Sequence, residues 1–418
     1  MAISWADFMK VLWLSHLVPY PPKGGVLQRS YNLIREVSKY HDIYLLAFIQ
    51  RDLIESHFDS YAEGLKEASD KLSEFCSKVK FVPISCDRNK YGKHYLAVKS
   101  LFTKYPYNIN WLYSEEYTKT LKEWKSDIKF DLVHYDTISL APYISELNGI
   151  VSVLDHHNVE SHMMLRRSSK ENNIIKKIYF YQEGVRLRTY EKKICPAFKI
   201  NITCSSLDSE LLSQVTGNIN IRVIPNGVDL NYFDPATNGD GMKRLVFVGM
   251  LNWYPNEQAV KFIAHELWPL IKQEIPDLSI DIIGPCPPTS ITEVAKEDDG
   301  FNVYGYIDDV RPYIERAAIY ICPIKDGGGT KLKILDALAM KKAIIADPIA
   351  CEGIEVTNNV NVLFASTPKE YMAKIKKVIS NEEMRITLGV NGRILAKEKY
   401  SFESIGKLLA GVYDECIR

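Results

Sequence analysis

The sequence predicts an α/β protein built on two doubly wound parallel sheets. Short apolar runs alternate with helical patterns along all 418 residues, as expected for strands joined by covering helices. A chain of this length suits two or three domains, each able to bury its own core. Residues 231–242 are rich in Asn, Asp, Gly and Pro, and a fresh apolar run follows them. One sheet is therefore expected on each side of this stretch.

The apolar runs give the strands in order. In the first half they cover residues 10–15, 43–49, 79–84, 131–135, 150–154 and 200–204. In the second half they cover residues 244–249, 278–283, 302–304, 318–322, 343–346 and 361–364. The predicted domains are residues 1–229, residues 243–390, and a C-terminal helical segment, 391–418.

Composition and charge argue against several classes of protein. Lys plus Arg equals Asp plus Glu at 52 each, so net charge points to no partner, and no nucleic-acid binding is expected. The eight cysteines are scattered without a Cys-x-x-Cys pair, which favours neither a zinc site nor a disulfide framework. No signal peptide is recognisable, and no apolar run approaches the about 18 residues of a membrane span. We expect a cytoplasmic protein that meets a membrane only from its surface, at the inner face.

The strongest local motif is the Gly-rich stretch of residues 326–330. The apolar run of residues 318–323 reads as a buried strand, and three glycines, residues 327–329, connect it to a helix expected to begin near Thr330. Glycines let a ligand approach the backbone closely, and a helix start offers unpaired N–H groups and the positive end of the dipole. The motif therefore predicts a phosphate-binding site.

Charged side chains follow on the same helix. Its apolar positions share one face, which leaves Lys333 and Asp336 on another side, one turn apart. Lys331 and Lys333 can reach a diphosphate at the helix start, and Asp336 can accept from ribose hydroxyls. This set suits a nucleoside diphosphate. The alternative is a core helix that follows a Gly-rich loop and carries a Lys–Asp pair on its surface.

Five stretches, in order, resemble the retaining glycosyltransferases of family 4. They are residues 21–25 (Pro-Pro-Lys-Gly-Gly), 155–160 (Asp-His-His-Asn-Val-Glu), 224–229 (Ile-Pro-Asn-Gly-Val-Asp), 247–249 (Phe-Val-Gly) and 326–354. Each is weak alone, but together they span most of the chain. The resemblance implies the GT-B fold, in which two Rossmann-like domains face one another across a cleft and the C-terminal one holds most of the nucleotide sugar.

The resemblance also implies site residues. His157 matches the active-site histidine that contacts the donor sugar or its phosphate, and its neighbour His156 could be confused with it. A histidine after a strand is more often structural, and Gly25 could serve only as a turn before a helix. The implied catalytic residues are His157, Lys331 and Lys333, and the implied donor-binding residues are Gly25, Gly249, Tyr306, Gly328, Gly329, Thr330, Asp336 and Glu352.

Two of these positions have a specific alternative. Tyr306 belongs to the segment of residues 305–307, whose backbone would contact the nucleobase, but such a Gly-aromatic-aliphatic triplet is more often a strand end. Glu352 lies in a loop that would flank the diphosphate and sugar, but it could equally cap a neighbouring helix.

The chain departs from the family pattern at two places. Residues 250–256 lack the Arg and Lys that many relatives have after this strand, so the two lysines of the Gly-rich motif must neutralise the diphosphate. Gly328 stands where many relatives have the first of two carboxylates eight positions apart, and Asp336 fits the second. Asp326 or Glu352 could compensate for the first.

The resemblance implies a retaining transfer of a hexose or related sugar, and a C-terminal segment, residues 391–418, that crosses back to the first domain. We expect no cofactor and no metal, because the lysines can take the place of a metal ion. The donor would be a nucleotide sugar, a UDP-sugar on family frequency, and the acceptor a polysaccharide or lipid-linked glycan, as in exopolysaccharide or lipopolysaccharide biosynthesis. Lysines and the helix start would stabilise charge that grows on the leaving phosphate. Two alternatives stay open, namely a GT-B sugar-nucleotide epimerase and a catalytically silent nucleotide-sugar-binding protein.

Two further segments bear on the acceptor. Residues 91–117 are dense in aromatic side chains and lysines, a combination that suits sugars or a membrane interface. Residues 166–199 hold ten Lys or Arg against three Glu on a predicted long helix. Such a run is usually a solvated face, and peripheral contact with an anionic membrane is the sharper hypothesis.

Overall fold

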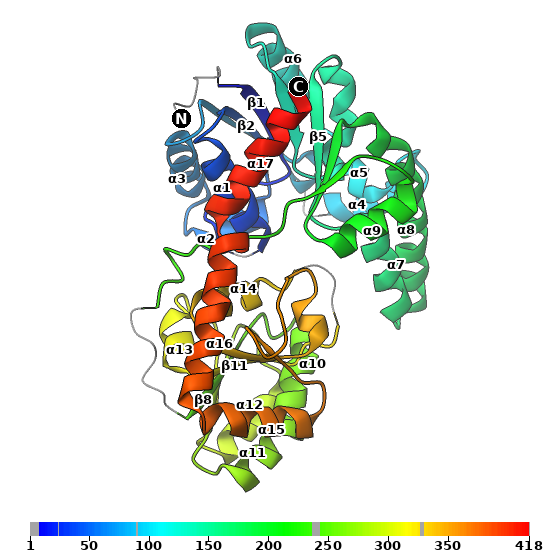
Figure 1. Cartoon of the computed structure of the whole chain (residues 1–418). Helices are drawn as coiled ribbons and strands as arrows, with labels where there is room; N and C mark the ends of the chain where they lie inside the picture. The colour runs from blue at the N-terminus through cyan, green and yellow to red at the C-terminus, as the bar shows by residue number, and fades with distance from the viewer. Residues whose placement is uncertain (1–7, 24, 89–90, 236–242, 327–329, 418) are drawn as a thin grey trace, which may run out of the picture. The chain divides into compact units, whose positions relative to one another are not determined.

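The computed structural model describes residues 8–23, 25–88, 91–235, 243–326 and 330–417 (Figure 1). The chain forms two compact units. Unit 1 comprises Met1–Pro225 and Ile405–Arg418, and unit 2 comprises Asn226–Ser404. Each unit is built on a parallel sheet, so the predicted fold class, with two Rossmann-like parallel-sheet domains, is confirmed. The segment of residues 391–418 is divided between the units after residue 404.

Unit 1 contains a seven-stranded sheet in the order β3-β2-β1-β4-β5-β6-β7. All of its pairings are parallel, and β1 lies between β2 and β4, with Val11 opposite Ile43 on one side and Leu132 on the other. Strand β7 was not predicted as a strand. The strands are β1 Lys10–Ser15, β2 Asp42–Ile49, β3 Lys78–Pro83, β4 Leu132–Tyr135, β5 Val151–His156, β6 Ile200–Thr203 and β7 Ile221–Val223.

Helices cover both faces of this sheet because its strands are apolar on both sides. In β1, Leu12 and Leu14 belong to one buried cluster, whereas Val11 and Trp13 belong to another on the opposite face. The helices are α1 Gly25–Val37, α2 Arg51–His57, α3 Tyr61–Ser73, α4 Gly92–Ser100, α5 Tyr107–Asn110, α6 Glu115–Asp127, α7 Glu160–Lys170, α8 Ile174–Ile194, α9 Ser206–Thr216 and α17 Phe402–Ile417.

The last helix, α17, contributes to the core of unit 1. Leu409 and Tyr413 are fully buried in the same cluster as Trp13. The hydroxyl of Tyr413 lies 2.8 Å from Nδ1 of His134, and the imidazole of His134 stacks on Trp13 with ring centroids 3.8 Å apart. Burial lowers the pKa of His134 to about 4, so this histidine is neutral.

Unit 2 contains a six-stranded parallel sheet in the order β10-β9-β8-β11-β12-β13. Its strands are β8 Arg244–Val248, β9 Ser279–Ile283, β10 Phe301–Tyr304, β11 Ile319–Cys322, β12 Ala343–Ala346 and β13 Leu363–Phe364. Its helices are α10 Tyr254–Phe262, α11 Trp268–Glu274, α12 Thr289–Glu297, α13 Arg311–Arg316, α14 Leu332–Ala339, α15 Pro368–Ile379 and α16 Glu382–Leu395.

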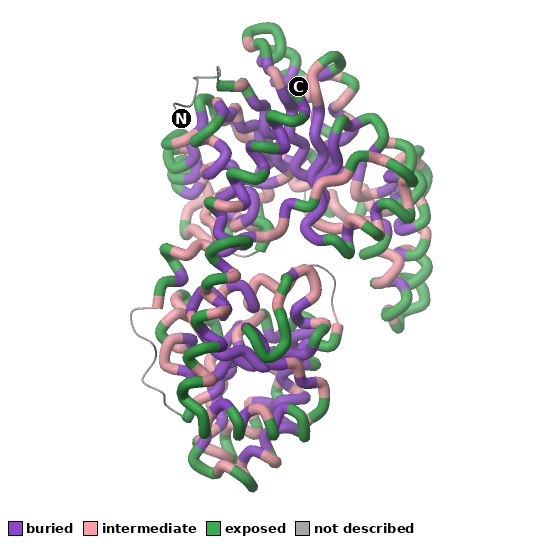
Figure 2. Tube along the Cα trace, in the orientation of Figure 1, coloured by how far each residue is buried: buried purple, intermediate pink, exposed green. Residues whose placement is uncertain are grey.

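The central strands of both units are deeply buried, as Figure 2 shows by colour. Strands β11 and β12 are buried along their whole length, which explains their continuous apolar runs. A buried carboxylate, Asp281 of β9, lies 2.6 Å from a guanidinium nitrogen of Arg244 and 2.6 Å from one of Arg316. None of the helices in the described ranges has the length and apolar character that a membrane crossing requires.

Candidate active site

In each unit, polar side chains gather where parallel strands end. The carboxyl ends of strands in an open α/β sheet are the usual place for a ligand, because loops there leave backbone groups and side chains unpaired. In unit 1 the group lies beyond β1, β4 and β5. In unit 2 it lies beyond β8 and β11.

The group in unit 1 is centred on Asp136, the residue that follows β4. Its carboxylate is buried, and the hydroxyls of Ser15 and Ser30 lie 3.0 and 3.1 Å from Oδ2. Nδ1 of His16 is 3.2 Å from Oδ2, and Nε2 of His157 is 3.1 Å from Oδ1. Residues from two strand ends and one helix therefore converge on the carboxylate at the end of a third strand.

This contact sets the charge of His157. Burial alone would lower the pKa of His157, but the charge of Asp136 and the hydrogen bond to it raise the pKa above its usual value. Burial would likewise raise the pKa of Asp136, but the charge of His157 and the hydrogen bonds from the two histidines hold it well below the usual range. A protonated imidazole bound to Asp136 through Nε2 keeps an N–H at Nδ1, for which no hydrogen-bond partner is found among the described residues.

The neighbouring residues have structural contacts. His156 is buried, and its Nε2 lies 3.1 Å from the side-chain oxygen of Asn201. Asp155 forms a buried ion pair with Arg29 of α1, whose second guanidinium nitrogen donates to the carbonyl of Pro225 at 2.9 Å. The two adjacent histidines thus differ, because His156 is buried in the sheet while His157 belongs to the cluster around Asp136.

Gly25 is the first residue of α1 and is exposed, close in sequence to this group. The preceding glycine, residue 24, lies outside the described residues. His157 directly follows β5, whereas Gly25 is separated from the end of β1 by residues 16–24.

The group in unit 2 is centred on Lys333, in the first turn of α14. Its ammonium donates to Oδ1 of Asn256 at 2.6 Å and lies 4.6 Å from the ring centroid of Phe247. The side-chain amide of Asn256 also donates to the carbonyl of Met250 at 2.8 Å. A Cβ on Gly249 would lie only 2.5 Å from the ammonium, so the glycine leaves the space that Lys333 occupies.

Burial weakens the charges of this group when no ligand is bound. It lowers the pKa of Lys333 to about 8, despite the opposing effect of Cys322 and Asp336. It raises the pKa of Asp336 to about 7, despite the opposing charge of Lys333. An anion bound beside Lys333 would restore its full charge, because a nearby negative charge favours the protonated form.

The start of α14 differs from the prediction. The helix begins at Leu332, with the extended backbone of Lys331 as its N-cap, rather than near Thr330. Oγ1 of Thr330 is buried and has no hydrogen-bond partner among the described residues. Lys331 is partly buried, and its charge contributes to lowering the pKa of Lys333. Gly328 and Gly329 lie outside the described residues.

The last two predicted residues lie beyond other strands of the same sheet. Tyr306 follows β10, is largely exposed, and lies 3.2 Å from Asp308 through its hydroxyl. Glu352 follows β12 and is the C-cap of a short 3₁₀-helix, Pro348–Cys351. Its backbone N–H donates to the carbonyl of Ile349. Its side chain is partly exposed.

Two family models match successive parts of the chain. The model described as Glycosyltransferase Family 4 matches residues 24–232, which is half of the chain, and the model described as Glycosyl transferases group 1 matches residues 242–381. The chain belongs to glycosyltransferase family 4. It is a glycosyltransferase of the GT-B type, and the two matches divide at the polar stretch that the sequence had marked as a boundary.

Individual relatives agree with this assignment. An uncharacterized 44.6 kDa protein in the cps region of Klebsiella pneumoniae is 22% identical over 95% of this chain and 97% of its own. The sucrose-phosphate synthase of Thermosynechococcus elongatus has a TM-score of 0.67 at 14% identity, covering 97% of this chain and 98% of its own. The HepE protein of Anabaena, solved in complex with UDP and glucose, has a TM-score of 0.61 at 14% identity, covering 97% and 99%. At this identity, the two solved structures establish likeness of fold.

Sequence reasoning missed three residues of the two polar groups. Asp136 and His16 each directly follow a buried strand. A polar residue at that position marks a candidate ligand-binding residue, so both could have been found from the sequence. Asn256 lies in the stretch that lacks the Arg and Lys of many relatives. Its signal was weaker, because an Asn in the first turn of a helix usually serves to cap that helix.

Two groups in unit 1 have the residue types of a metal site. The ligand atoms of His16, Asp136 and His157 all lie within 4.8 Å of one another, as do those of His134, Asp136 and Asp155. In the first group, the imidazole nitrogens that face Asp136 already form hydrogen bonds with it. A metal ion would have to replace these hydrogen bonds, and metal independence stays a prediction.

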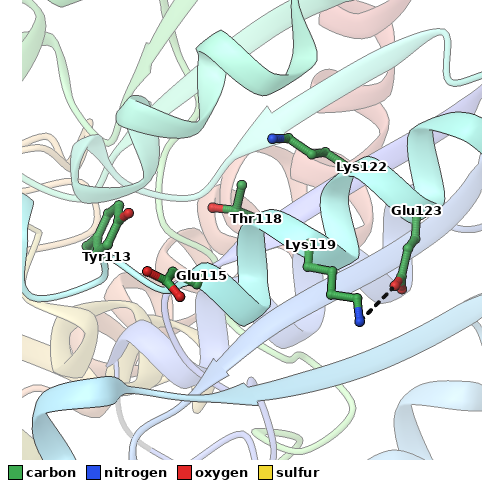
Figure 3. A pocket seen from close by; sticks show the side chains of 6 residues that line it. All are labelled: Tyr113, Glu115, Thr118, Lys119, Lys122 and Glu123. Carbon is green, nitrogen blue, oxygen red and sulfur yellow. Dashed lines mark ion pairs between the residues drawn. The ribbon is translucent and has the colours of Figure 1, made fainter.

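A separate hollow of about 360 Å³ lies on the surface at α6 (Figure 3). A single ion pair, Lys119 with Glu123 at 3.9 Å, crosses part of it. It shares no residue with either polar group, so it is not part of the candidate active site. It is lined by Tyr113, Glu115, Thr118, Lys119, Lys122 and Glu123.

Proposed function

We propose that this glycosyltransferase moves a sugar from a UDP-sugar to a polysaccharide or lipid-linked glycan, with retention of the anomeric configuration. The observation that carries the proposal is the position of Lys333. Its ammonium lies beside Gly249 at the end of β8 and on the first turn of α14, where cationic and backbone donors can meet one anion. The UDP bound by the HepE protein of Anabaena supports the choice of nucleotide.

The donor diphosphate is assigned to the start of α14. Lys333 and Lys331 neutralise its charge, and backbone N–H groups at the helix start add donors. Asp336, one turn further along, accepts from the ribose hydroxyls. As the sugar leaves, negative charge grows on the β-phosphate, and the same lysines stabilise it more strongly than in the ground state.

His157 is assigned to the donor sugar or its phosphate. With Nε2 bound to Asp136, its Nδ1–H can donate to an oxygen of the donor. The acceptor hydroxyl attacks from the face that the nucleotide leaves, and no protein nucleophile is required. In this proposal the lysines and the helix start supply the positive charge for which other enzymes use a metal ion.

The acceptor is assigned by chemistry class alone. The cps-region location of the Klebsiella pneumoniae relative supports a surface polysaccharide or its lipid-linked precursor. The sugar that is transferred stays open, because Gly328 stands where relatives have a carboxylate near the donor sugar.

The test is nucleotide release from UDP-, GDP- and ADP-sugars, measured without acceptor and with a bacterial lipid-glycan extract. We expect release from a UDP-sugar, stimulated by the extract and lost in Lys333→Ala. Lys377→Ala, which removes an exposed lysine on α15, is the matched control and should retain activity. Nucleotide binding without turnover of any donor would instead indicate a silent binder, and conversion of the donor sugar without acceptor would indicate an epimerase.

A further inference from the structure

Helix α8 of unit 1 carries apolar side chains on two opposite faces. Phe180 and Leu187 face inward and are buried. The outer face has a stripe of four residues spaced at i, i+4, i+7 and i+11, each 43–65% exposed, which helical periodicity places in one row. Figure 2 shows the outer side of α7 and α8 as exposed. The stripe consists of Ile174, Ile178, Tyr181 and Val185.

A second stripe with the same spacing lies on α4. Its four side chains are 59–85% exposed, and the helix side opposite to it carries Ser100, which is fully buried. Exposure of four large apolar side chains in one row costs solubility unless another surface covers them. This stripe consists of Tyr91, Tyr95, Val98 and Phe102.

The two stripes belong to elements that are fixed to one another. Arg186, on α8, donates to the carbonyl of Ser100 at 2.7 Å and also to that of Thr103, so it holds the end of α4. The carboxylate of Glu183 accepts from the backbone N–H of Tyr107 at the start of α5, at 2.9 Å. We call the eight residues of the two stripes the α4–α8 surface.

Positive charge flanks the apolar stripe of α8. Lys177 lies near its start, and Arg188, Lys192 and Lys193 follow its last residue, all of them exposed. The two carboxylates of α8, Glu183 and Glu191, are both buried and face inward. The outer face of α8 therefore presents apolar and cationic groups together, without an exposed carboxylate on the same helix.

This combination distinguishes between two kinds of partner. The buried parts of protein interfaces are depleted in lysine, whereas helices that lie on membranes pair an apolar row with Lys and Arg that reach anionic headgroups. We propose that the α4–α8 surface binds an anionic lipid membrane. The inference rests on the proposed function in one respect, since the membrane would then present a lipid-linked acceptor to the enzyme.

The α4–α8 surface is linked to the polar group of unit 1 through helices α7 and α5. Helix α7 begins at Glu160, three residues after His157, and packs against α8. The carboxylate of Glu160 accepts from the side-chain amide of Asn108 on α5 at 3.2 Å. A membrane held by α4 and α8 would therefore lie against the elements that follow directly from the His157 loop.

The test is co-sedimentation of the whole chain with vesicles of phosphatidylglycerol and phosphatidylcholine in equal parts, compared with pure phosphatidylcholine. Wild type should sediment with the anionic vesicles only. Ile178→Ser/Tyr181→Ser and Tyr95→Ser/Phe102→Ser should each reduce binding, and Lys177→Gln/Lys192→Gln should reduce it about fivefold per lysine, the equivalent of about 1 kcal/mol each. The matched control, Ile386→Ser/Ile394→Ser on α16, removes two exposed apolar side chains elsewhere and should bind like wild type.

Vesicle binding that the stripe and lysine variants leave unchanged overturns the proposal. Wild type that stays in the supernatant with anionic vesicles rules out the membrane. A dimer in solution that the stripe variants abolish would identify a second copy as the occupant instead. Circular dichroism confirms that each variant is folded. Nucleotide release by the soluble protein separates the two proposals, because lost vesicle binding with intact release refutes the membrane site alone, whereas intact vesicle binding without release refutes the transferase alone.

Discussion

The contact between Gly249 and Lys333 allows a test that moves the lysine without removing it. A Cβ at residue 249 would lie 2.5 Å from the ammonium and 3.0 Å from the amide nitrogen of Asn256. Both are ends of side chains that can shift, so Gly249→Ala should fold normally but displace the ammonium. Loss of one hydrogen bond to a charged group costs about 1.5–3 kcal/mol, which corresponds to a UDP Kd about 10- to 150-fold higher.

Isothermal titration calorimetry with UDP on four proteins completes the test. They are wild type, Gly249→Ala, Lys333→Met and the double variant. If the methyl group acts only by displacing the lysine, the double variant should bind UDP like Lys333→Met. The wild-type affinity should also fall as pH rises through about 8, where the free lysine loses its proton, and Lys333→Met should lack this fall. A further loss on adding Gly249→Ala to Lys333→Met would refute the reasoning.

Three further predictions concern buried carboxyl groups. Asp136→Asn removes the charge that raises the pKa of His157, so the alkaline limb of turnover should move to lower pH, as a pH–rate profile would show. Asp281→Ala leaves two guanidinium groups without their carboxylate and should lower the free energy of unfolding in urea by about 3–5 kcal/mol. Burial raises the pKa of Glu160 from 4.5 to about 7, so folding should lose stability as pH rises through that window. Glu160→Gln should remove this loss, and an unchanged pH dependence of the melting temperature would contradict the assignment.

The fold could be predicted from the sequence because each buried strand is a continuous apolar run. Strands β1 and β11, for example, were predicted with nearly their observed bounds. Strand β7 was missed because it is only three residues long and partly exposed, so it lacks that signal. The start of α14 was placed too early because Lys331 has good helix propensity, while its actual backbone is extended.

The candidate site could be predicted from the sequence only in part. Helical spacing placed Lys333 and Asp336 one turn apart on one element, and the charge of each affects the pKa of the other. The contact of Lys333 with Asn256 joins residues 77 positions apart, and that of His16 with Asp136 joins residues 120 apart. Local periodicity carries no information on such contacts, which arise only when parallel strands bring their ends together.

The discontinuity of unit 1 has a consequence for biosynthesis. Residues 405–417 complete the packing around β1 and β4, where Tyr413 contacts His134, yet they follow the whole of unit 2 along the chain. Unit 2 is continuous and can fold as soon as it has left the ribosome. Unit 1, although synthesised first, must wait with an open core until its last helix emerges. During translation the order of folding is therefore the reverse of the order of the sequence, and the exposed face of the unfinished unit is where a chaperone would bind.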